Sequence, residues 1–214
     1  ARMSTSSSAC ALPAPPAAGG TDLVVELVEH HHWAGGAEMG QNGVIFNPNI
    51  PTEEAFTMPK KTGVNGTVVS TKPLNYQGRL VENFKLTFKD GAVVDFSAEK
   101  EEAALKNLLN VDEGSKYLGE VALISHNSPI SNSGVLFLNT LFDENASCHL
   151  ALGRAYPMNV KGGNDMNEEQ LLAAGANMSM EHVDFMFGSA DMRIIGTRFD
   201  GSEVVVFDQG NFVI

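Results

Sequence analysis

Cysteine and positive charge are both scarce in this sequence. Its 214 residues include two cysteines, Cys10 and Cys148. This is too few for a disulfide framework or a thiolate zinc site, so a reducing cytoplasm is the expected compartment. Lysine and arginine number 14 against 26 aspartates and glutamates, which gives a formal net charge of −12. A chain this acidic is not expected to bind nucleic acid or an anionic membrane surface. No apolar run approaches the length of a membrane span.

The first 20 residues are rich in alanine, serine, proline and glycine, and they show no apolar periodicity. This composition is typical of linkers and frayed ends, and proline interrupts the only apolar part, which argues against a secretory signal. We therefore interpret residues 1–20 as a tail or linker. Residues 21–214 are long enough to bury a substantial core.

The remainder of the chain is predominantly strand-like. The turn signal Lys89-Asp90-Gly91 predicts a hairpin, and β-type apolar patterns predict strands over 21–28, 66–74, 78–88 and 92–99. Helices are fewer. Residues 98–110 are predicted to form a helix that is capped by Ser97 and packs on the core through Ala104, Leu105, Leu108 and Leu109. Asn167 and Gln170 predict a capping box for another helix, and Gly175 suits its end.

Residues 141–156 concentrate polar groups in an otherwise apolar stretch. The alanines and leucines predict a helix over 143–154, with Asp143 as its N-cap. On such a helix His149 and Tyr156 would lie within about 20° of each other, whereas Glu144 would lie about 140° from His149. A buried polar stripe needs a partner, and a metal ion is one candidate.

Further acids and histidines occur on predicted strands. Glu120 opens the apolar strand 117–126 and would share a face with Ala122 and Ile124. His182 and Asp184 are two residues apart, which places both side chains on one face, about 7 Å apart at the backbone, suitable for holding a cation. A histidine that only hydrogen-bonds its neighbouring acid explains that pair about equally well. Simpler interpretations also cover the other polar groups: solvated surface charge for Glu53 and Glu54, and structural or exposed side chains for His30, His31, His32 and His126.

Several longer stretches resemble the aminopeptidase T/aminopeptidase S family of metallo-aminopeptidases, also called thermophilic metalloproteases. The most specific are NTLFDENASCHLALG and LGEVAL, and the others include GTDLVVEL, NIPTEEAFTMP, STKPLNYQGRLVENFKLTF and EHVDFMFGS with IIGTRFDGSEVVVF. Together they extend, in order, from Gly20 to the end of the chain. The resemblance implies an α+β fold in which a strand-rich mixed sheet curls into a barrel with a few packed helices. It also implies that the family's α/β domain, which precedes this region, is absent here.

The resemblance carries a metal site onto this sequence residue by residue. The implied ligands are Glu54, Glu120, Glu144, His149, Tyr156, His182 and Asp184. For Glu54 this replaces the interpretation as solvated surface charge, and for Glu120 it replaces that of an acid at an exposed strand end. A set of carboxylates, imidazoles and a phenol suits two divalent ions such as Zn²⁺, Co²⁺ or Mn²⁺.

The implied activity is that of an aminopeptidase that removes N-terminal residues from peptide substrates with a metal-activated water. Glu144 is the expected proton shuttle, and Tyr156 is expected to coordinate metal or to donate a hydrogen bond to the oxyanion. The full-length family implies a homodimer. Protonation of the ligand histidines predicts weaker metal binding below about pH 6.

Two alternatives remain at this point. The chain is a truncated metal-binding fragment if the ions stabilise its fold without turnover. Alternatively, Cys148 acts as a nucleophile beside His149; sequence neighbours on a helix point about 100° apart, which disfavours such a pair.

Overall fold

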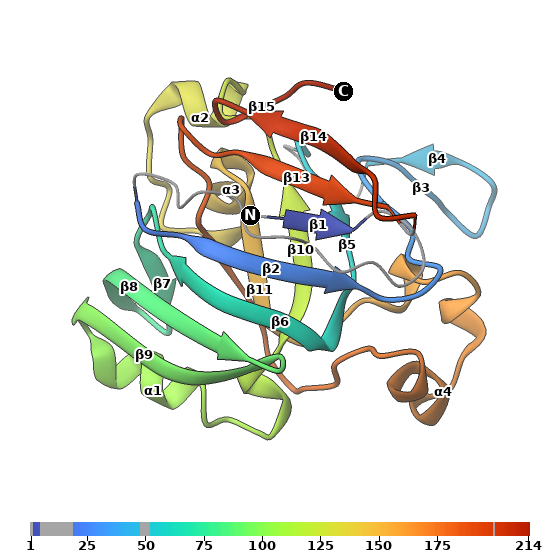
Figure 1. Cartoon of the computed structure of the whole chain (residues 1–214), viewed down its shortest axis with the longest axis horizontal. Helices are drawn as coiled ribbons and strands as arrows, with labels where there is room; N and C mark the ends of the chain where they lie inside the picture. Colours follow the sequence, from blue (N-terminus) through green and yellow to red (C-terminus); the bar gives the residue numbers. More distant parts are fainter. Residues whose placement is uncertain (1, 5–18, 48–51, 199) are drawn as a thin grey trace.

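The computed structural model describes residues 2–4, 19–47, 52–198 and 200–214 and shows two main sheets with short helices (Figure 1). The larger sheet has nine strands. Eight follow the order β15 (Asn211–Phe212), β14 (Glu203–Asp208), β13 (Ile194–Thr197), β1 (Arg2–Ser4), β2 (Asp22–Leu27), β6 (Pro59–Val69), β8 (Arg79–Lys89) and β7 (Leu74–Tyr76), and β9 (Ala92–Lys100) pairs with β8. The smaller sheet has the order β12 (His182–Met186), β11 (His149–Gly153), β10 (Leu118–Leu123) and β5 (Ala55–Thr57).

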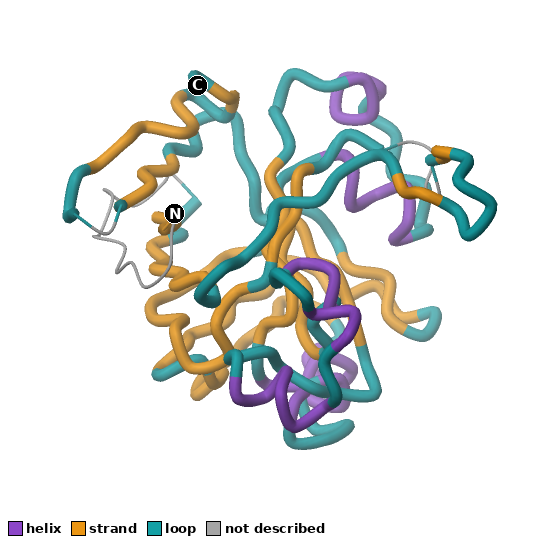
Figure 2. The backbone as a smooth tube through the Cα atoms, turned by 90° about the vertical axis from the view of Figure 1, so that its right-hand side faces the viewer, coloured by secondary structure: helices purple, strands orange, loops and turns teal. Residues whose placement is uncertain are grey.

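A separate two-stranded hairpin is formed by β3 (Glu38–Met39) and β4 (Ile45–Phe46). The helices lie around the outside of the strands (Figure 2). They are α1 (Glu102–Leu108), α2 (Pro129–Ser133), α3 (Thr140–Asp143), α4 (Glu168–Ala173) and the 3-10 helices η1 (Gly114–Lys116), η2 (Glu144–Ala146), η3 (Pro157–Asn159) and η4 (Gly163–Asp165). The mixed α+β class is thus confirmed. In the part of the chain that the structure describes, no helix is long and apolar enough to cross a bilayer.

The predicted barrel is wrong for the described residues. A barrel requires hydrogen bonds between the first and last strands of a sheet. The nine-stranded sheet instead runs from β15 to β7 as an open path, and the four-stranded sheet runs from β12 to β5. Both sheets contribute to one core, in which the rings of Phe84 on β8 and Phe185 on β12 lie 5.4 Å apart. The chain therefore encloses its core between two open sheets.

The hairpin between β8 and β9 and the strand at 21–28 are confirmed. Asp90 and Gly91 both have positive φ, 50° and 85°, as a tight hairpin turn requires. A Cβ at position 91 would lie 1.8 Å from the Lys61 carbonyl oxygen, so glycine is needed there. The capping box of Asn167 and Gln170 on α4 is also confirmed.

Two helix predictions need correction. Ser97 lies in β9 and caps nothing, because the strand continues to Lys100 and the chain turns at Glu101, where φ is 57°. The helix that follows nevertheless buries Ala104, Leu105 and Leu108, as predicted, and Leu109 just after it. The second error is larger: residues 143–154 do not form a helix, because the helical turns end at Ala146 and β11 begins at His149.

Residues 2–4 form β1, between β2 and β13, although the composition of residues 1–20 predicts no strand. Residues 1 and 5–18 of the predicted tail lie outside the described residues.

Candidate metal centre

The register of the four-stranded sheet places four of the implied ligands on one face. Glu120 on β10 lies opposite Ala151 on β11, and Ala151 lies opposite Asp184 on β12. His149 is two residues before Ala151, and His182 is two residues before Asp184. Because side chains alternate along a strand and directly paired residues share a face, all of these side chains project from the same side of the sheet. The small side chain of Ala151 leaves room between the two carboxylates.

Glu54 reaches the same face from the segment just before β5. Ala122 on β10 pairs with Phe56 on one side and with His149 on the other, so Phe56 also faces the site. Glu54 is two residues before Phe56, and its side chain lies beside His149. The prediction that Glu120 shares a face with Ala122 is confirmed by this register. The candidate site therefore draws on every strand of the sheet.

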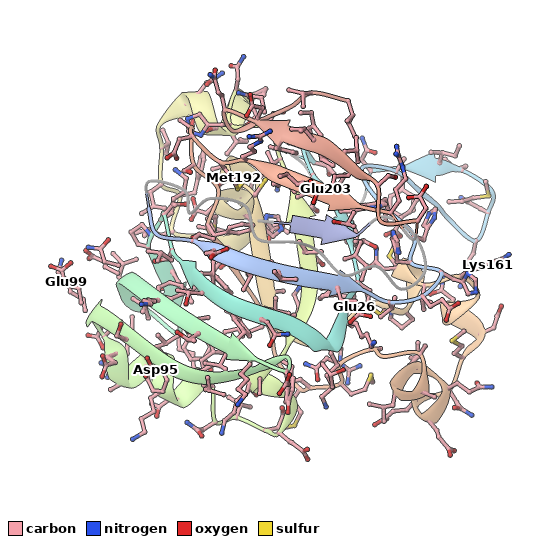
Figure 3. The ribbon with its side chains drawn as sticks, viewed as in Figure 1. Glu26, Asp95, Glu99, Lys161, Met192 and Glu203 are labelled. Carbon is pink, nitrogen blue, oxygen red and sulfur yellow. The ribbon has the colours of Figure 1, made fainter. Side chains whose placement is uncertain are left out.

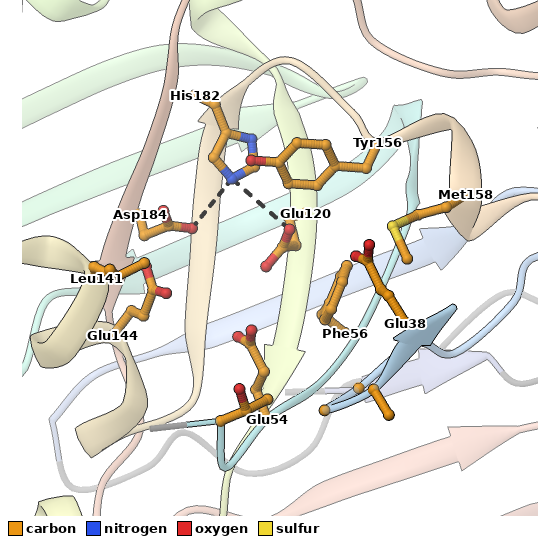
Figure 4. Close-up of a pocket in the computed structure, with 14 residues that line it drawn as sticks. Glu38, Glu54, Phe56, Glu120, Leu141, Glu144, Tyr156, Met158, His182 and Asp184 are labelled. Carbon is orange, nitrogen blue, oxygen red and sulfur yellow. Dashed lines mark ion pairs between the residues drawn. The ribbon is translucent and has the colours of Figure 1, made fainter. Parts of the chain in front are cut away.

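The side chains converge closely (Figure 4). His149 Nε2 lies 3.1 Å from Glu54 Oε2 and 3.5 Å from Glu120 Oε1. His182 Nε2 lies 3.7 Å from Glu120 Oε2 and 3.5 Å from Asp184 Oδ1. Glu120 is common to both groups, and each of its oxygens faces a different imidazole. Glu54, Glu120 and His149 can hold one cation, and Glu120, His182 and Asp184 can hold another.

Both histidines are oriented through Nδ1. His149 Nδ1 lies 2.9 Å from the Glu144 carbonyl oxygen, and His182 Nδ1 lies 2.7 Å from the Arg154 carbonyl oxygen. A carbonyl oxygen only accepts, so each Nδ1 must donate its N–H, and in the neutral ring Nε2 carries the lone pair. That lone pair points at carboxylate oxygens, which repel it unless a proton or a cation lies between them. Histidine ligands of metal ions are commonly held in this way.

The donor atoms fit a divalent cation. Glu54 Oε2, His149 Nε2 and Asp184 Oδ1 are buried, and no hydrogen bond of good geometry from the described residues satisfies them. Such atoms are costly to bury alone, and a shared cation offsets that cost. Carboxylate oxygens with imidazole nitrogens, and no thiolate, form a set that suits Zn²⁺, Co²⁺ or Mn²⁺.

Glu144 is placed at the same site by η2. Burial, together with the charge of Asp184, raises the pKa of Glu144 from 4.5 to about 8. Burial acts in the same direction on Asp184, but His182, His149 and a hydrogen bond with Glu144 hold its pKa below the usual value. Two carboxyl groups can share a hydrogen bond only if one is protonated. The opposite shifts place that proton on Glu144 at neutral pH.

The two imidazoles gain proton affinity from the surrounding acids. Burial alone would lower the pKa of His182, but Asp184 and Glu120 raise it from 6.5 to about 9. Burial likewise opposes protonation of His149, yet Glu120, Glu54 and Asp184 raise its pKa well above 6.5. In the absence of a metal ion the site therefore attracts protons.

Tyr156 lies at the entrance of the site and not on a helix with His149. Its ring centroid is 4.5 Å from that of His182 and 6.4 Å from that of Phe56, and the residue is 38% exposed. Burial, with the charges of Glu120 and Asp184, raises the pKa of Tyr156 to about 12. The phenol is therefore neutral near pH 7. It borders a cavity of about 330 Å³ that Glu38, Glu54, Phe56, Glu120, Leu141, Glu144, Met158, His182 and Asp184 also line.

Asn145, which lies near the site, had no predicted role. Asn145 is fully buried; its Oδ1 accepts from the Glu53 backbone N–H at 2.9 Å and its Nδ2 donates to the Leu141 carbonyl oxygen at 3.2 Å. It ties the Glu53-Glu54 segment to the helical turns that carry Glu144. The prediction of a solvated surface charge is wrong for Glu53, which is only partly exposed and accepts from the Ile130 N–H at 3.3 Å. The sequence did contain a signal for the role of Asn145, because an asparagine inside an apolar stretch needs hydrogen-bond partners when it is buried.

The simpler interpretations hold for the remaining histidines. His30, His31 and His32 border a separate hollow, and His126 is exposed. None of them joins either cation-binding group in the described parts of the chain. Cys148 belongs to neither cation-binding group of the described residues. Its thiol contacts the backbone of Ile124, and burial raises its pKa to about 12, so it is not a nucleophile.

Comparison with known proteins agrees with this geometry. The chain is 58% identical over 193 residues to "Aminopeptidase 2" of Geobacillus stearothermophilus and 54% identical over 193 residues to "Aminopeptidase AmpS" of Bacillus subtilis, covering 90% of this chain and 47% of each relative. A solved structure of wild-type AmpT from Thermus thermophilus superposes with a TM-score of 0.87 at 43% identity, over 94% of this chain and 49% of that one. The chain thus spans about half the length of these relatives. Residues 16–212 match the model of the thermophilic metalloproteases, M29, and the chain belongs to that family.

Proposed function

We propose that this chain carries the catalytic metal centre of an aminopeptidase that hydrolyses the first peptide bond of its substrates with two divalent ions, Zn²⁺, Co²⁺ or Mn²⁺. The observation that carries the proposal is the position of Glu120 between two imidazoles, each with its own further carboxylate. A bridging acid flanked by two separate donor groups is what a pair of ions requires. The aminopeptidase names of the relatives agree with this reading.

Glu54, Glu120 and His149 would hold one ion, and Glu120, His182 and Asp184 the other. When bound, such ions lower the pKa of a shared water and polarise the scissile carbonyl group. The backbone carbonyls of Glu144 and Arg154 keep both imidazoles in the required tautomer. The buried sheet face holds the ligands rigidly, because their strands also form the core on the opposite face.

Glu144 is proposed as the proton shuttle. A carboxyl group with a pKa of about 8 exchanges a proton readily near neutral pH, as a general acid–base group must. The ionised form of Glu144 would accept a proton from the attacking water, and the protonated form would then deliver that proton to the leaving nitrogen. Tyr156 stays protonated at this pH, so its hydroxyl can donate a hydrogen bond to the oxyanion of the tetrahedral intermediate. The further roles of Glu144 and Tyr156 as ligands of either metal ion stay predictions.

The cavity favours the amino end of a peptide over the carboxyl end. Its lining includes the carboxylates Glu38, Glu54, Glu120, Glu144 and Asp184 and neither lysine nor arginine among the described residues. A negative potential attracts an α-ammonium group and repels a C-terminal carboxylate. Exopeptidase action from the amino end follows from this polarity. Assembly as a homodimer and a cytoplasmic location also stay predictions.

The competing proposal is a metal-binding fragment without turnover, since the chain spans about half of its relatives. Hydrolysis of leucine-p-nitroanilide with and without added Co²⁺ separates the two. The aminopeptidase proposal expects metal-dependent release of nitroaniline that a chelator abolishes. Stoichiometric metal binding with no hydrolysis of any aminoacyl-p-nitroanilide would favour the fragment.

A further inference from the structure

The β3–β4 hairpin presents one carboxylate to the cavity that no metal-binding group uses. Glu38 lies on β3, and its side chain points into the cavity between Met158 and Phe56 (Figure 4). The hairpin itself stands out from the two sheets (Figure 1). Glu38 thus faces the candidate site from an element that belongs to neither sheet.

The backbone fixes this hairpin relative to the site. Ala34, four residues before Glu38, exchanges both backbone hydrogen bonds with Phe56 at 2.9 Å. Gly35 approaches the Glu54 segment so closely that a Cβ there would lie 2.6 Å from the Glu54 carbonyl oxygen. The chain that leads to Glu38 is therefore packed directly on the segment that carries Glu54.

Unlike the other acids of the cavity, Glu38 has no side-chain partner among the described residues. Glu54, Glu120 and Asp184 lie beside imidazole nitrogens, and Glu144 shares a hydrogen bond with Asp184. Within the described ranges the side chain of Glu38 makes no hydrogen bond and no ion pair, and the residue is exposed. A carboxylate that points into a binding cavity without a partner is available to a cation from outside.

Charge counting leads to the same residue. The four carboxylates Glu54, Glu120, Glu144 and Asp184 carry at most four negative charges, which two divalent ions would neutralise. The loaded centre itself would then contribute little to the negative potential of the cavity. Glu38 is the remaining negative charge in the lining, and peptide α-amino groups, with pKa values of about 8, are mostly protonated at pH 7.

We propose that Glu38 binds the α-ammonium group of the substrate and so makes the site selective for free amino termini. This proposal rests on the proposed aminopeptidase function, because it assigns the amino-end subsite of that same cavity. Phe56 and Met158 lie on either side of the Glu38 carboxylate, and a substrate bound in the cavity would reduce the exposure of the ion pair and strengthen it. Glu38 is then a specificity-determining residue and not a metal ligand.

The test compares two ligands that differ only in the amino group. Leucinamide and 4-methylpentanamide are titrated into the Zn²⁺-loaded chain by calorimetry, for the wild type, Glu38→Gln, Glu38→Asp and the control Asp95→Asn. Asp95 is an exposed acid on β9, on the opposite side of the view from the hairpin (Figures 1 and 3). Metal content is measured for every variant.

Glu38→Gln is expected to weaken leucinamide binding roughly 10- to 100-fold, the usual worth of a charge-assisted contact, and to leave 4-methylpentanamide binding and metal content unchanged. Glu38→Asp should retain part of the preference for leucinamide over 4-methylpentanamide, and Asp95→Asn should retain all of that preference. Hydrolysis of leucine-p-nitroanilide is measured in parallel, where Glu38→Gln should raise KM more than it lowers kcat.

The outcomes separate the two proposals. A wild type that binds leucinamide no better than 4-methylpentanamide, or a Glu38→Gln variant that keeps the preference, overturns the role of Glu38. If the preference exists and Glu38→Gln removes it, but the wild type hydrolyses no substrate, the role of Glu38 stands and the aminopeptidase proposal fails.

Discussion

The two faces of the four-stranded sheet share the same strands but perform opposite tasks. One face carries Val121, Leu150 and Phe185, which lie in one cross-strand row and pack into the main core. The other face carries Glu120 and Asp184 with Ala151 between them. On β11 the residues alternate, so Leu150 stabilises the fold while His149 beside it faces the site.

The difference shows how a buried cluster of charge is kept in place. The core face gains free energy from apolar burial, about 2 kcal/mol for each large side chain. The site face buries carboxylates and imidazoles whose lone pairs face one another, which opposes folding until protons or cations intervene. Apolar burial on the core face therefore offsets the unfavourable burial of charge on the site face. Substitutions on the core face should change stability, and substitutions on the site face should change metal binding and activity.

The largest expected effect comes from the site face. Glu120→Gln keeps the shape of the side chain but removes the carboxylate common to both cation-binding groups. Turnover should fall on the order of 10³-fold or more, since metal ions supply several kcal/mol of transition-state stabilisation. Bound metal should fall as well. Steady-state kinetics and elemental analysis of the purified variant check both.

The metal-free Glu120→Gln variant should be no less stable than the metal-free wild type, because burial raises the pKa of Glu120 and makes its charged form costly. Wild-type activity at full metal occupancy would contradict the assignment of Glu120.

The core face should give the converse result. Leu150 is completely buried and lies one residue from His149 on β11. Leu150→Ala should lower the free energy of unfolding by about 2–5 kcal/mol, from lost burial and the cavity left behind. Metal stoichiometry at 25 °C should not change. Urea unfolding and metal analysis measure the two quantities, and loss of metal in a folded Leu150→Ala variant would show that the faces are not separable.

The faces should also differ in their response to pH. Only the site face titrates: the pKa of Glu144 is raised from 4.5 to about 8 and that of His182 from 6.5 to about 9. Between the ordinary pKa and the raised pKa of each group, the folded metal-free chain binds more protons than the unfolded chain. The free energy of unfolding must therefore fall as pH rises from about 5 to 9. Urea unfolding in the presence of a chelator at pH 6 and pH 9 measures this slope, and equal stabilities would contradict the shifts.

With metal present the trend should reverse, because binding requires both imidazoles to release their protons. Because the pKa values of His149 and His182 are raised, the loss of metal affinity is expected to begin at a higher pH. Affinity should decline already as pH falls below about 9, and not only below pH 6 as the ordinary histidine pKa suggests. Titration calorimetry in buffers of different ionisation enthalpy reports the protons released at pH 7.

Alternation along strands made part of the site predictable. The placement of Glu120 with Ala122, and of His182 with Asp184, follows from period two in short apolar runs. The strand at His149–Gly153 was predicted as a helix, because alanine and leucine are strong helix formers and the run is buried on both faces. An uninterrupted apolar run shows no alternation, so pairing with β10 and β12 decides its conformation.

The convergence of the site has a different origin. Glu120, His149 and Asp184 meet through cross-strand register, and register depends on partners that are distant in the sequence. Only the family resemblance could unite them before the structure. Glu38 had no signal of any kind, because its place at the cavity depends on the backbone pairing of Ala34 with Phe56.

The smallest expected effect tests the separation of the faces most simply. Cys148 comes directly before His149, but its thiol contacts Ile124 and its high pKa keeps it protonated. Cys148→Ala should therefore change kcat/KM less than about twofold and cost on the order of 1 kcal/mol of stability through lost packing and a lost hydrogen bond. Kinetics and thermal unfolding measure the two. A large loss of activity at unchanged metal content would place chemistry on the core side of β11, and the division of this sheet into a supporting face and a reactive face would then fail.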